Sequence, residues 1–212
     1  MSQPLGKDDL ARLIAGDIPD GSYVNLGIGQ PTSIAHHLKP DSGVILHTEN
    51  GMLGMGEVVP ADRADWDLTN AGKQPVTELP GAAYFHHADS FAMMRGGHLD
   101  VCVMGAFQVS AAGDLANWHT GAPDAIPAVG GAMDLAVGAK EVWVMMTLFT
   151  KTGEPKLVPE CTYPLTGKTC VTRVYTEVAT FLVGGEGVRV VNTFGITFEE
   201  LESRLDVPLA RP

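Results

Sequence analysis

The chain has 212 residues, of which 45% are hydrophobic and 18% are charged, a composition typical of a globular protein with a sizeable core. Its apolar runs are far too short to cross a bilayer, and its formal net charge of −11 at pH 7 disfavours binding to nucleic acid or to an anionic membrane. An anionic substrate would therefore have to be bound by local groups, such as backbone N–H groups or single basic residues.

The cysteines and the first residues indicate a cellular compartment. Cys102, Cys161 and Cys170 are odd in number and lack CxxC spacing, which argues against a disulfide framework and favours a reducing cytoplasm. The first nine residues contain no apolar segment of the kind that a secretory signal peptide needs. We therefore expect a cytoplasmic protein, and the length predicts a single domain over residues 1–212.

The N-terminal part predicts a strand–helix–strand unit. Apolar residues at helical spacing predict an amphipathic helix over residues 8–18. Two buried strands, over residues 22–29 and 44–48, flank a short helix that begins at Pro31, a residue type that helix starts tolerate. This order predicts a parallel strand pair joined by a right-handed crossover, and hence the α/β class.

The rest of the chain continues this pattern around a middle rich in glycine and proline. The predicted elements are a helix over residues 89–94 and strands over residues 101–109, 141–146, 171–183 and 188–194. The last two strands are expected to form a hairpin around residues 184–187, Gly-Gly-Glu-Gly. Thr197 and Glu200 form a capping-box pattern that opens a C-terminal helix.

The 25 glycines are the unusual part of the composition, because many of them stand at the ends of apolar runs. Glycine at a strand end lets the backbone turn sharply or approach a ligand closely. Gly27 and Gly29 resemble a turn at a helix start whose backbone N–H groups could bind an anion. A lone GxG is equally compatible with an ordinary turn, so both interpretations stay open.

Glu49 directly follows the predicted strand over residues 44–48 and precedes Asn50 and Gly51. On residue types alone, the three residues could be a turn with a solvated carboxylate. The carboxyl ends of parallel strands, however, are where α/β sheets place their chemistry. Glycine-marked segments elsewhere in the chain could converge there, which makes Glu49 the leading candidate for a reacting group.

The sequence around Glu49 resembles a known family. Residues 46–54, Leu-His-Thr-Glu-Asn-Gly-Met-Leu-Gly, resemble the glutamate signature of the class I coenzyme A transferases, beta subunit. Further matching segments follow in order over nearly the whole chain: residues 25–29, 31–32, 70–73, 90–98, 105–109, 113–118, 130–134 and 164–168. The resemblance implies an open, largely parallel α/β sheet flanked by helices.

The resemblance also implies that Glu49 is a nucleophile. Its carboxylate attacks the thioester carbonyl of an acyl-CoA, and the released CoA thiolate then leaves CoA as a thioester on the glutamate. Each tetrahedral intermediate carries an oxyanion, for which Gly130 and Gly131 are the candidate backbone donors, with a plain loop bend as the alternative. This chemistry needs no metal and no organic cofactor, since the CoA esters are substrates.

Partner and substrate follow from the same resemblance. The chain matches the glutamate half of the family, which implies a separate alpha subunit in a heterodimer or heterotetramer, with CoA bound mostly across the interface. Residues 117–122, 126–131 and 161–167 resemble members that act on 3-oxoadipate, so we expect CoA transfer from succinyl-CoA to 3-oxoadipate. The alternatives are succinyl-CoA:acetoacetate transfer, a non-catalytic ligand-binding member of the fold, and a sugar-phosphate isomerase of related architecture.

Other polar residues give weaker signals. The histidine pairs at 36–37 and 86–87 do not predict a metal site, because adjacent residues point in different directions and no third ligand has suitable spacing. Lys73 and Arg95 could contact carboxylates or phosphates or could lie in surface ion pairs. Cys102 is predicted to be a buried apolar residue. Further candidates for polar site residues are Gln108 and Asn117.

Overall fold

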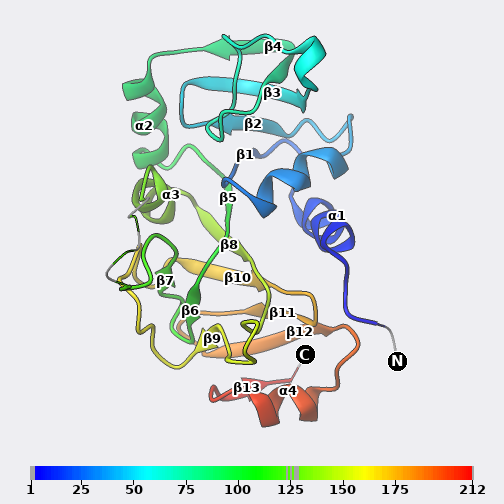
Figure 1. The fold of residues 1–212 in the computed structure, drawn as a ribbon, viewed down its shortest axis with the longest axis vertical. Helices are drawn as coiled ribbons and strands as arrows, with labels where there is room; N and C mark the ends of the chain where they lie inside the picture. Colours follow the sequence, from blue (N-terminus) through cyan, green and yellow to red (C-terminus); the bar gives the residue numbers. More distant parts are fainter. Residues whose placement is uncertain (1–2, 123, 125, 127–128, 212) are drawn as a thin grey trace.

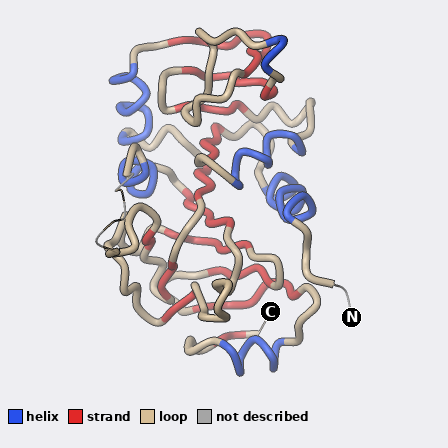
Figure 2. The backbone as a smooth tube through the Cα atoms, viewed as in Figure 1, coloured by secondary structure: helices blue, strands red, loops and turns tan. Residues whose placement is uncertain are grey.

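The computed structural model describes residues 3–122, 124, 126 and 129–211, and its fold is drawn in Figures 1 and 2. The helices are α1 (Lys7–Asp17), η1 (Gln30–His37), η2 (Ala61–Arg63), α2 (His87–Arg95), α3 (Ala132–Gly138) and α4 (Phe198–Arg204), of which η1 and η2 are 3-10 helices. The strands are β1 (Tyr23–Leu26), β2 (Ile45–Thr48), β3 (Met52–Val58), β4 (Val76–Tyr84), β5 (Val101–Met104), β6 (Gln108–Ser110), β7 (Leu115–Ala116), β8 (Glu141–Met145), β9 (Leu157–Val158), β10 (Val171–Tyr175), β11 (Ala179–Leu182), β12 (Val188–Thr193) and β13 (Leu209–Ala210).

A ten-stranded sheet forms the frame of the described chain, in the order β13-β12-β11-β10-β8-β5-β1-β2-β3-β4 (Figure 1). Its centre is parallel, from β2 through β1, β5 and β8 to β10. Antiparallel pairs extend the sheet on both sides, through β3 and β4 at one end and β11 and β12 at the other. The edge strand β13 pairs in parallel with β12. The predicted open, largely parallel α/β sheet is therefore confirmed, with antiparallel pairs confined to its two flanks.

Helices cover both faces of the sheet (Figure 2). Leu10 and Ile14 of α1 belong to one core cluster, together with Val103 of β5. Met94 of α2 belongs to the other cluster, which also includes Cys102. Successive residues of β5 thus point into different cores, as the period of a strand requires, and this explains why the central strands are apolar along their whole length.

Most of the predicted elements are found near their expected places. The amphipathic N-terminal helix is α1, and the hairpin around residues 184–187 joins β11 and β12. The capping box at Thr197 and Glu200 is present in both directions. The expected strand–helix–strand unit is β1–η1–β2 with parallel pairing, although its helix is a 3-10 helix.

Two of the predicted strands are wrong, because each predicted segment forms two separate strands in the structure. The run over residues 101–109 is broken after Met104, where the chain leaves the large sheet for β6 of a small sheet in the order β7-β6-β9. The run over residues 171–183 is a hairpin of β10 and β11. Its turn is closed by the hydroxyl of Thr176, which accepts from the Ala179 N–H at 2.9 Å and donates to the Ala179 carbonyl at 2.7 Å.

No helix within the described residues is long and apolar enough to cross a membrane.

Candidate active site

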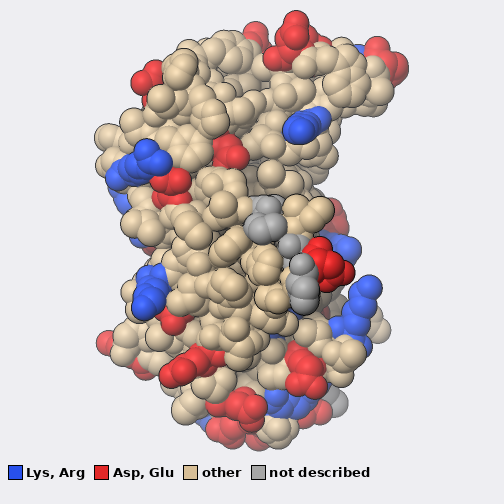
Figure 3. All heavy atoms as spheres, turned by 60° about the vertical axis from the view of Figure 1, so that its left-hand side comes forward, with Lys and Arg blue, Asp and Glu red and all other residues tan. Residues whose placement is uncertain are grey.

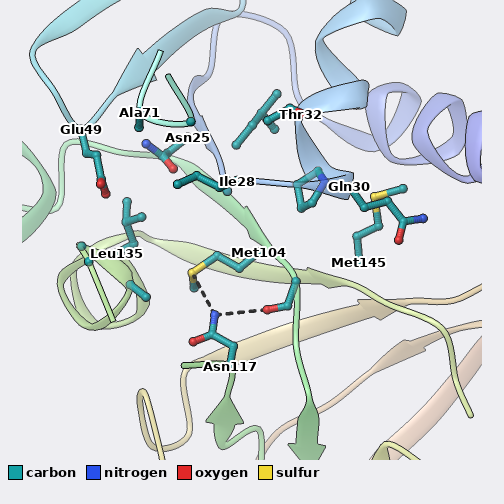
Figure 4. Close-up of a pocket in the computed structure, with 18 of the residues that line it drawn as sticks. Asn25, Ile28, Gln30, Thr32, Glu49, Ala71, Met104, Asn117, Leu135 and Met145 are labelled. Carbon is teal, nitrogen blue, oxygen red and sulfur yellow. Dashed lines mark hydrogen bonds between the residues drawn. The ribbon is translucent and has the colours of Figure 1, made fainter. Parts of the chain in front are cut away.

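The carboxyl ends of β1, β2, β5 and β8 surround a pocket of about 450 Å³ (Figure 4). β1 pairs with β2 on one side and with β5 on the other, so the order of the strands reverses at β1. Open α/β sheets generally bind their ligands at such a reversal, beyond the carboxyl ends of the strands. Residues 70–72 and 129–132 come from elsewhere in the chain to line the same pocket.

Glu49 stands at the end of β2, and its carboxylate lies in this pocket (Figure 4). The turn interpretation of residues 49–51 is also correct, because β2 and β3 form an antiparallel hairpin across it. The Gly51 N–H donates to the Thr48 carbonyl at 3.1 Å, and a Cβ on Gly51 would collide with the carbonyl of Phe85. The Asn50 side chain donates to the Thr69 carbonyl at 2.8 Å. These contacts fix the turn that carries the half-buried glutamate.

Gly130 and Gly131 lie against the Glu49 carboxylate. A Cβ on Gly131 would overlap Oε2, and a Cβ on Gly130 would stand 3.8 Å from Oε1. Gly130 has a φ of +47°, and Gly131 caps α3, with its carbonyl accepting from the Leu135 N–H at 3.0 Å. The fold therefore brings these two glycines to the candidate nucleophile, and their role as oxyanion donors remains a prediction.

Gly27 and Gly29 lie differently. Gly27 lines the pocket, but its N–H donates to the Val103 carbonyl at 2.8 Å, so it would have to break a strand contact to bind an anion. Gly29 has a φ of +96° and precedes η1, where its carbonyl accepts from the amide and the hydroxyl of Thr32. It is not among the residues that line the pocket. These contacts favour the ordinary-turn interpretation of this GxG.

A buried polar network lies behind the nucleophile. Asn25 and His47 are register partners on β1 and β2, and the Asn25 amide nitrogen contacts both His47 Nδ1 at 3.1 Å and the His47 carbonyl at 3.2 Å. Because a carbonyl can only accept, this nitrogen donates to it, and Nδ1 accepts as well. The ring proton is then on Nε2, which donates to Ser90 Oγ at 2.9 Å, and Ser90 donates to the Thr48 carbonyl at 3.3 Å.

The network holds His47 as a neutral ring. Its side chain is almost wholly buried, and this burial lowers the pKa of His47 from 6.5 to about 4. The chain of donors runs from β1 through β2 to α2 and ends on the residue before Glu49. None of Asn25, His47 or Ser90 was predicted as a site residue. For Asn25 and His47 the available signals were their polar side chains inside apolar strands, since buried polar groups need partners. All three residues also lie in segments that resemble the family.

The other polar candidates are distributed between the pocket and the surface. Asn117 lines the pocket and donates to the Gly105 carbonyl at 3.1 Å (Figure 4). Gln108 accepts from the Thr162 N–H at 2.8 Å, which fixes a loop. Arg95 pairs with Asp134 at 2.6 Å, in agreement with the surface ion-pair interpretation.

Lys73 is exposed, with a φ of +61°, and Cys102 is buried as predicted. Among the described residues, no three His, Cys, Asp or Glu side chains are grouped so that they could hold a metal ion.

A carboxylate beside a glycine-rich loop at a strand end is the arrangement that the sequence signature implies, and comparison with known proteins decides the family. Residues 7–192 match the family model described as "Coenzyme A transferase". This chain belongs to the coenzyme A transferase family.

Members of this family resemble the chain over its whole length. It is 59% identical over 212 residues to the B subunit of the 3-oxoadipate CoA-transferase of Pseudomonas putida, covering 100% of this chain and 99% of that one. The B subunit of a probable succinyl-CoA:3-ketoacid coenzyme A transferase of Bacillus subtilis is 43% identical over 195 residues, with 92% and 90% covered. The crystal structure of an acyl-CoA transferase apoenzyme from Escherichia coli O157:H7 has the same fold, with a TM-score of 0.76 at 17% identity, over 100% of this chain and 43% of that one.

Proposed function

We propose that this coenzyme A transferase chain carries the nucleophile of an enzyme that moves CoA from succinyl-CoA to 3-oxoadipate. The observation that carries the proposal is the Glu49 carboxylate, which lies in a pocket at the strand ends against Gly130 and Gly131. The substrate is supported by the 59% identity, over the full chain, to the B subunit of a 3-oxoadipate CoA-transferase. A relative named for 3-ketoacids is less similar, at 43% identity, so acetoacetate is the second candidate acceptor.

The reaction follows from the nucleophile. The Glu49 carboxylate attacks the thioester carbonyl of succinyl-CoA, and the C–S bond breaks to give a mixed anhydride and CoA thiolate. The thiolate attacks the glutamyl carbonyl, which releases succinate and leaves CoA as a thioester on Glu49. A carboxylate of 3-oxoadipate then attacks this thioester, which gives a second mixed anhydride and frees the CoA thiolate. The thiolate attacks the 3-oxoadipyl carbonyl of the anhydride, so that 3-oxoadipyl-CoA forms and the Glu49 carboxylate is regenerated. Carboxylates and thiolates act as nucleophiles and leaving groups throughout, so the proposed cycle uses neither a metal nor an organic cofactor.

The surroundings of Glu49 suit these steps. Each tetrahedral intermediate places negative charge on an oxygen beside Glu49, where the N–H groups of Gly130 and Gly131 would stabilise it. The absence of a side chain on Gly131 leaves room for the carboxylate to lie against the loop backbone. Behind it, the Asn25–His47–Ser90 network and the Asn50–Thr69 bond hold the turn. Fixing the attacking group in this way reduces the entropy that the reaction must lose.

The proposal includes a partner subunit. The Pseudomonas and Bacillus relatives are both named as B subunits, and the Escherichia coli chain is more than twice as long as the part that matches. Ile28 and Phe107 line the pocket and are 66% and 41% exposed, so large apolar side chains face solvent at the pocket. The middle of the face in Figure 3 carries few charged side chains. A complementary alpha subunit would cover such a surface and complete the site, in a heterodimer or heterotetramer.

A cytoplasmic location is part of the same proposal. Cys102, Cys161 and Cys170 are free thiols, and burial is the main cause that raises the pKa of each. Reduced, unreactive cysteines suit a protein that works in a reducing compartment.

Trapping the intermediate tests the proposed function. The co-expressed pair of subunits is incubated with succinyl-CoA and no acceptor acid, digested, and searched by mass spectrometry for CoA on the peptide that contains Glu49. We expect a CoA thioester at Glu49 that hydroxylamine cleaves, with loss of activity. A non-catalytic ligand-binding protein or an isomerase would give no adduct. Transfer to acetoacetate with an efficiency equal to or above that for 3-oxoadipate would favour the second candidate acceptor.

A further inference from the structure

Lys156 is the one lysine or arginine among the described residues that line the pocket. Its backbone is held on both sides: its N–H donates to the Leu148 carbonyl at 2.9 Å, and its carbonyl accepts from the Val109 N–H at 2.9 Å. It directly precedes β9, which pairs in parallel with β6. The lysine therefore projects from a fixed point between the segment that follows β8 and the small sheet. No sequence signal singled it out.

The charge of Lys156 lacks a close partner within the described part of the chain. None of the ion pairs there includes this residue, although it is partly buried. Glu177 is the acid that influences it, but no ion pair joins the two residues, and Glu177 Oε2 accepts from the Leu148 N–H at 3.0 Å. Burial is the larger effect and lowers the pKa of Lys156, while Glu177 opposes the shift. A desolvated cation without a paired anion is unfavourable, so this position favours the arrival of an anionic group.

Lys156 and Glu49 stand on different sides of the pocket. Glu49 follows β2, and Lys156 adjoins the segment that follows β8, with β1 and β5 between them in the sheet. Three strand spacings separate β2 from β8, which amounts to about 14 Å between strand axes. Both residues line the same pocket. Apolar side chains, including Met104 and Met145, line the space between these strand ends (Figure 4).

We propose that Lys156 binds the second carboxylate of a dicarboxylic acyl group whose first carboxyl carbon reacts at Glu49. This inference rests on the proposed function and specifies how its substrates are recognised. Succinyl and 3-oxoadipyl groups both carry a carboxylate at the end remote from the reacting carbon, joined to it by an aliphatic chain. The flexible four-carbon stem of lysine lets one ammonium serve both chain lengths. A monocarboxylic acid leaves the ammonium unpaired, and the site discriminates against it.

The test uses a pair of acids that differ at one end and the covalent intermediate as the starting point. 3-Oxohexanoate matches 3-oxoadipate in length and in its 3-oxo group but ends in a methyl group. The enzyme–CoA thioester is prepared from the two-subunit complex, separated from free succinyl-CoA, and mixed with each acid in turn. Because CoA is already bound, the second-order rate constant of transfer reports on recognition of the acid. The variants are Lys156→Met, which keeps the aliphatic stem, and Lys156→Arg, which keeps the charge, with exposed Lys151→Met as the control.

We expect Lys156→Met to lower the rate constant for 3-oxoadipate by roughly a hundredfold while changing that for 3-oxohexanoate by less than about threefold. Lys156→Arg should retain most of the preference, and Lys151→Met should behave as the wild type. The rate with 3-oxohexanoate shows in the same sample that the variant is folded. An equal loss with both acids would assign Lys156 to CoA or to the fold and overturn the inference, as would an unchanged ratio. A wild-type complex that forms no thioester would overturn the proposed function itself.

Discussion

Gly131 lies so close to Glu49 that a Cβ at position 131 would overlap the carboxylate oxygen Oε2. The two residues are far apart in sequence and come from different elements, one from the start of α3 and the other from the end of β2. The overlap comes mainly from the Glu49 side chain, with Phe91 Cζ also 3.3 Å away, and not from the backbone, since Gly131 has a φ of −86° that any residue can adopt. The same alanine substitution would meet less resistance if the carboxylate were elsewhere.

Gly131→Ala should consequently reduce catalysis more than stability. The added methyl group must displace the Glu49 carboxylate or the loop, and a misplacement of about 1 Å can lower the rate roughly a hundredfold. We expect a fall in kcat/KM of that order with a Tm close to that of the wild type. Gly16→Ala on α1 is the control, because a Cβ there meets nothing within 4 Å. A Gly131→Ala enzyme with wild-type kcat/KM would show that the loop does not restrain the carboxylate.

The sequence predicted the centre of the fold well because central strands are buried on both faces. Apolar runs such as that of β5, Val-Cys-Val-Met, are unambiguous when both sides of a strand are covered. The same continuous apolar sequence made the ends of the strands hard to predict. At residues 176–178 the hairpin turn is closed by a backbone bond from the Thr176 N–H to the Ala179 carbonyl and by the Thr176 hydroxyl. Thr-Glu-Val between apolar residues is no turn signal. β4 was missed because most of its residues are exposed on an edge of the sheet.

The site residues that could be predicted are those identified by the residues next to them in the sequence. Glu49 and the Gly130–Gly131 pair have local signatures, and the fold brings them together. The Asn25–His47–Ser90 network depends on the register of β1 with β2 and on the packing of α2, which no local pattern encodes. Lys156 could not be predicted for the same reason, because its place in the pocket follows from the pairing of β9 with β6.

The buried imidazole of His47 should make stability depend on pH. The pKa of His47 is about 4 in the folded chain, against an ordinary value of 6.5 for the unfolded chain. Above pH 6.5 both states hold a neutral ring, so the contribution of this group is fully present. As the pH falls from 6.5 towards 4, the unfolded chain binds a proton and the folded chain does not. The free energy of unfolding then falls by about 1.4 kcal/mol per pH unit, to a total of about 3 kcal/mol.

His47→Gln isolates this contribution, because glutamine is polar but does not titrate. Urea unfolding at pH 7.5 and pH 5 should show a drop in the wild-type free energy that exceeds the drop in the variant by roughly 2 kcal/mol. Comparing the two drops removes the effect of the carboxylates, which the wild type and the variant share. His36→Gln, at an exposed position, controls for the removal of a histidine elsewhere. Parallel drops in the wild type and His47→Gln would contradict a buried neutral His47.

The chain alone should have little transferase activity. Its pocket opens between exposed apolar residues, including Ile28 and Phe107, which a partner is proposed to cover. We expect the isolated chain to bind a hydrophobic dye and to turn over below about one per cent of the rate of the complex, since removing water from a site strengthens its electrostatic interactions several-fold. Titration with the alpha subunit should restore activity and reduce dye binding together. Full specific activity from the homogeneous chain would contradict the proposed division of the site.

Glu49→Gln gives the most direct test of the nucleophile. An amide is a far poorer nucleophile than a carboxylate, so the variant should still bind the alpha subunit and succinyl-CoA but form no CoA adduct. Activity should fall by several orders of magnitude, as expected when a covalent step is removed. Glu49→Asp keeps the carboxylate but withdraws it by about one carbon–carbon bond, and a shift near 1 Å can lower the rate roughly a hundredfold. Glu57→Gln, on an exposed residue of β3, makes the same chemical change outside the pocket and should leave activity intact. Near-wild-type turnover in Glu49→Gln, or a CoA adduct on another residue, would assign the chemistry to a different group.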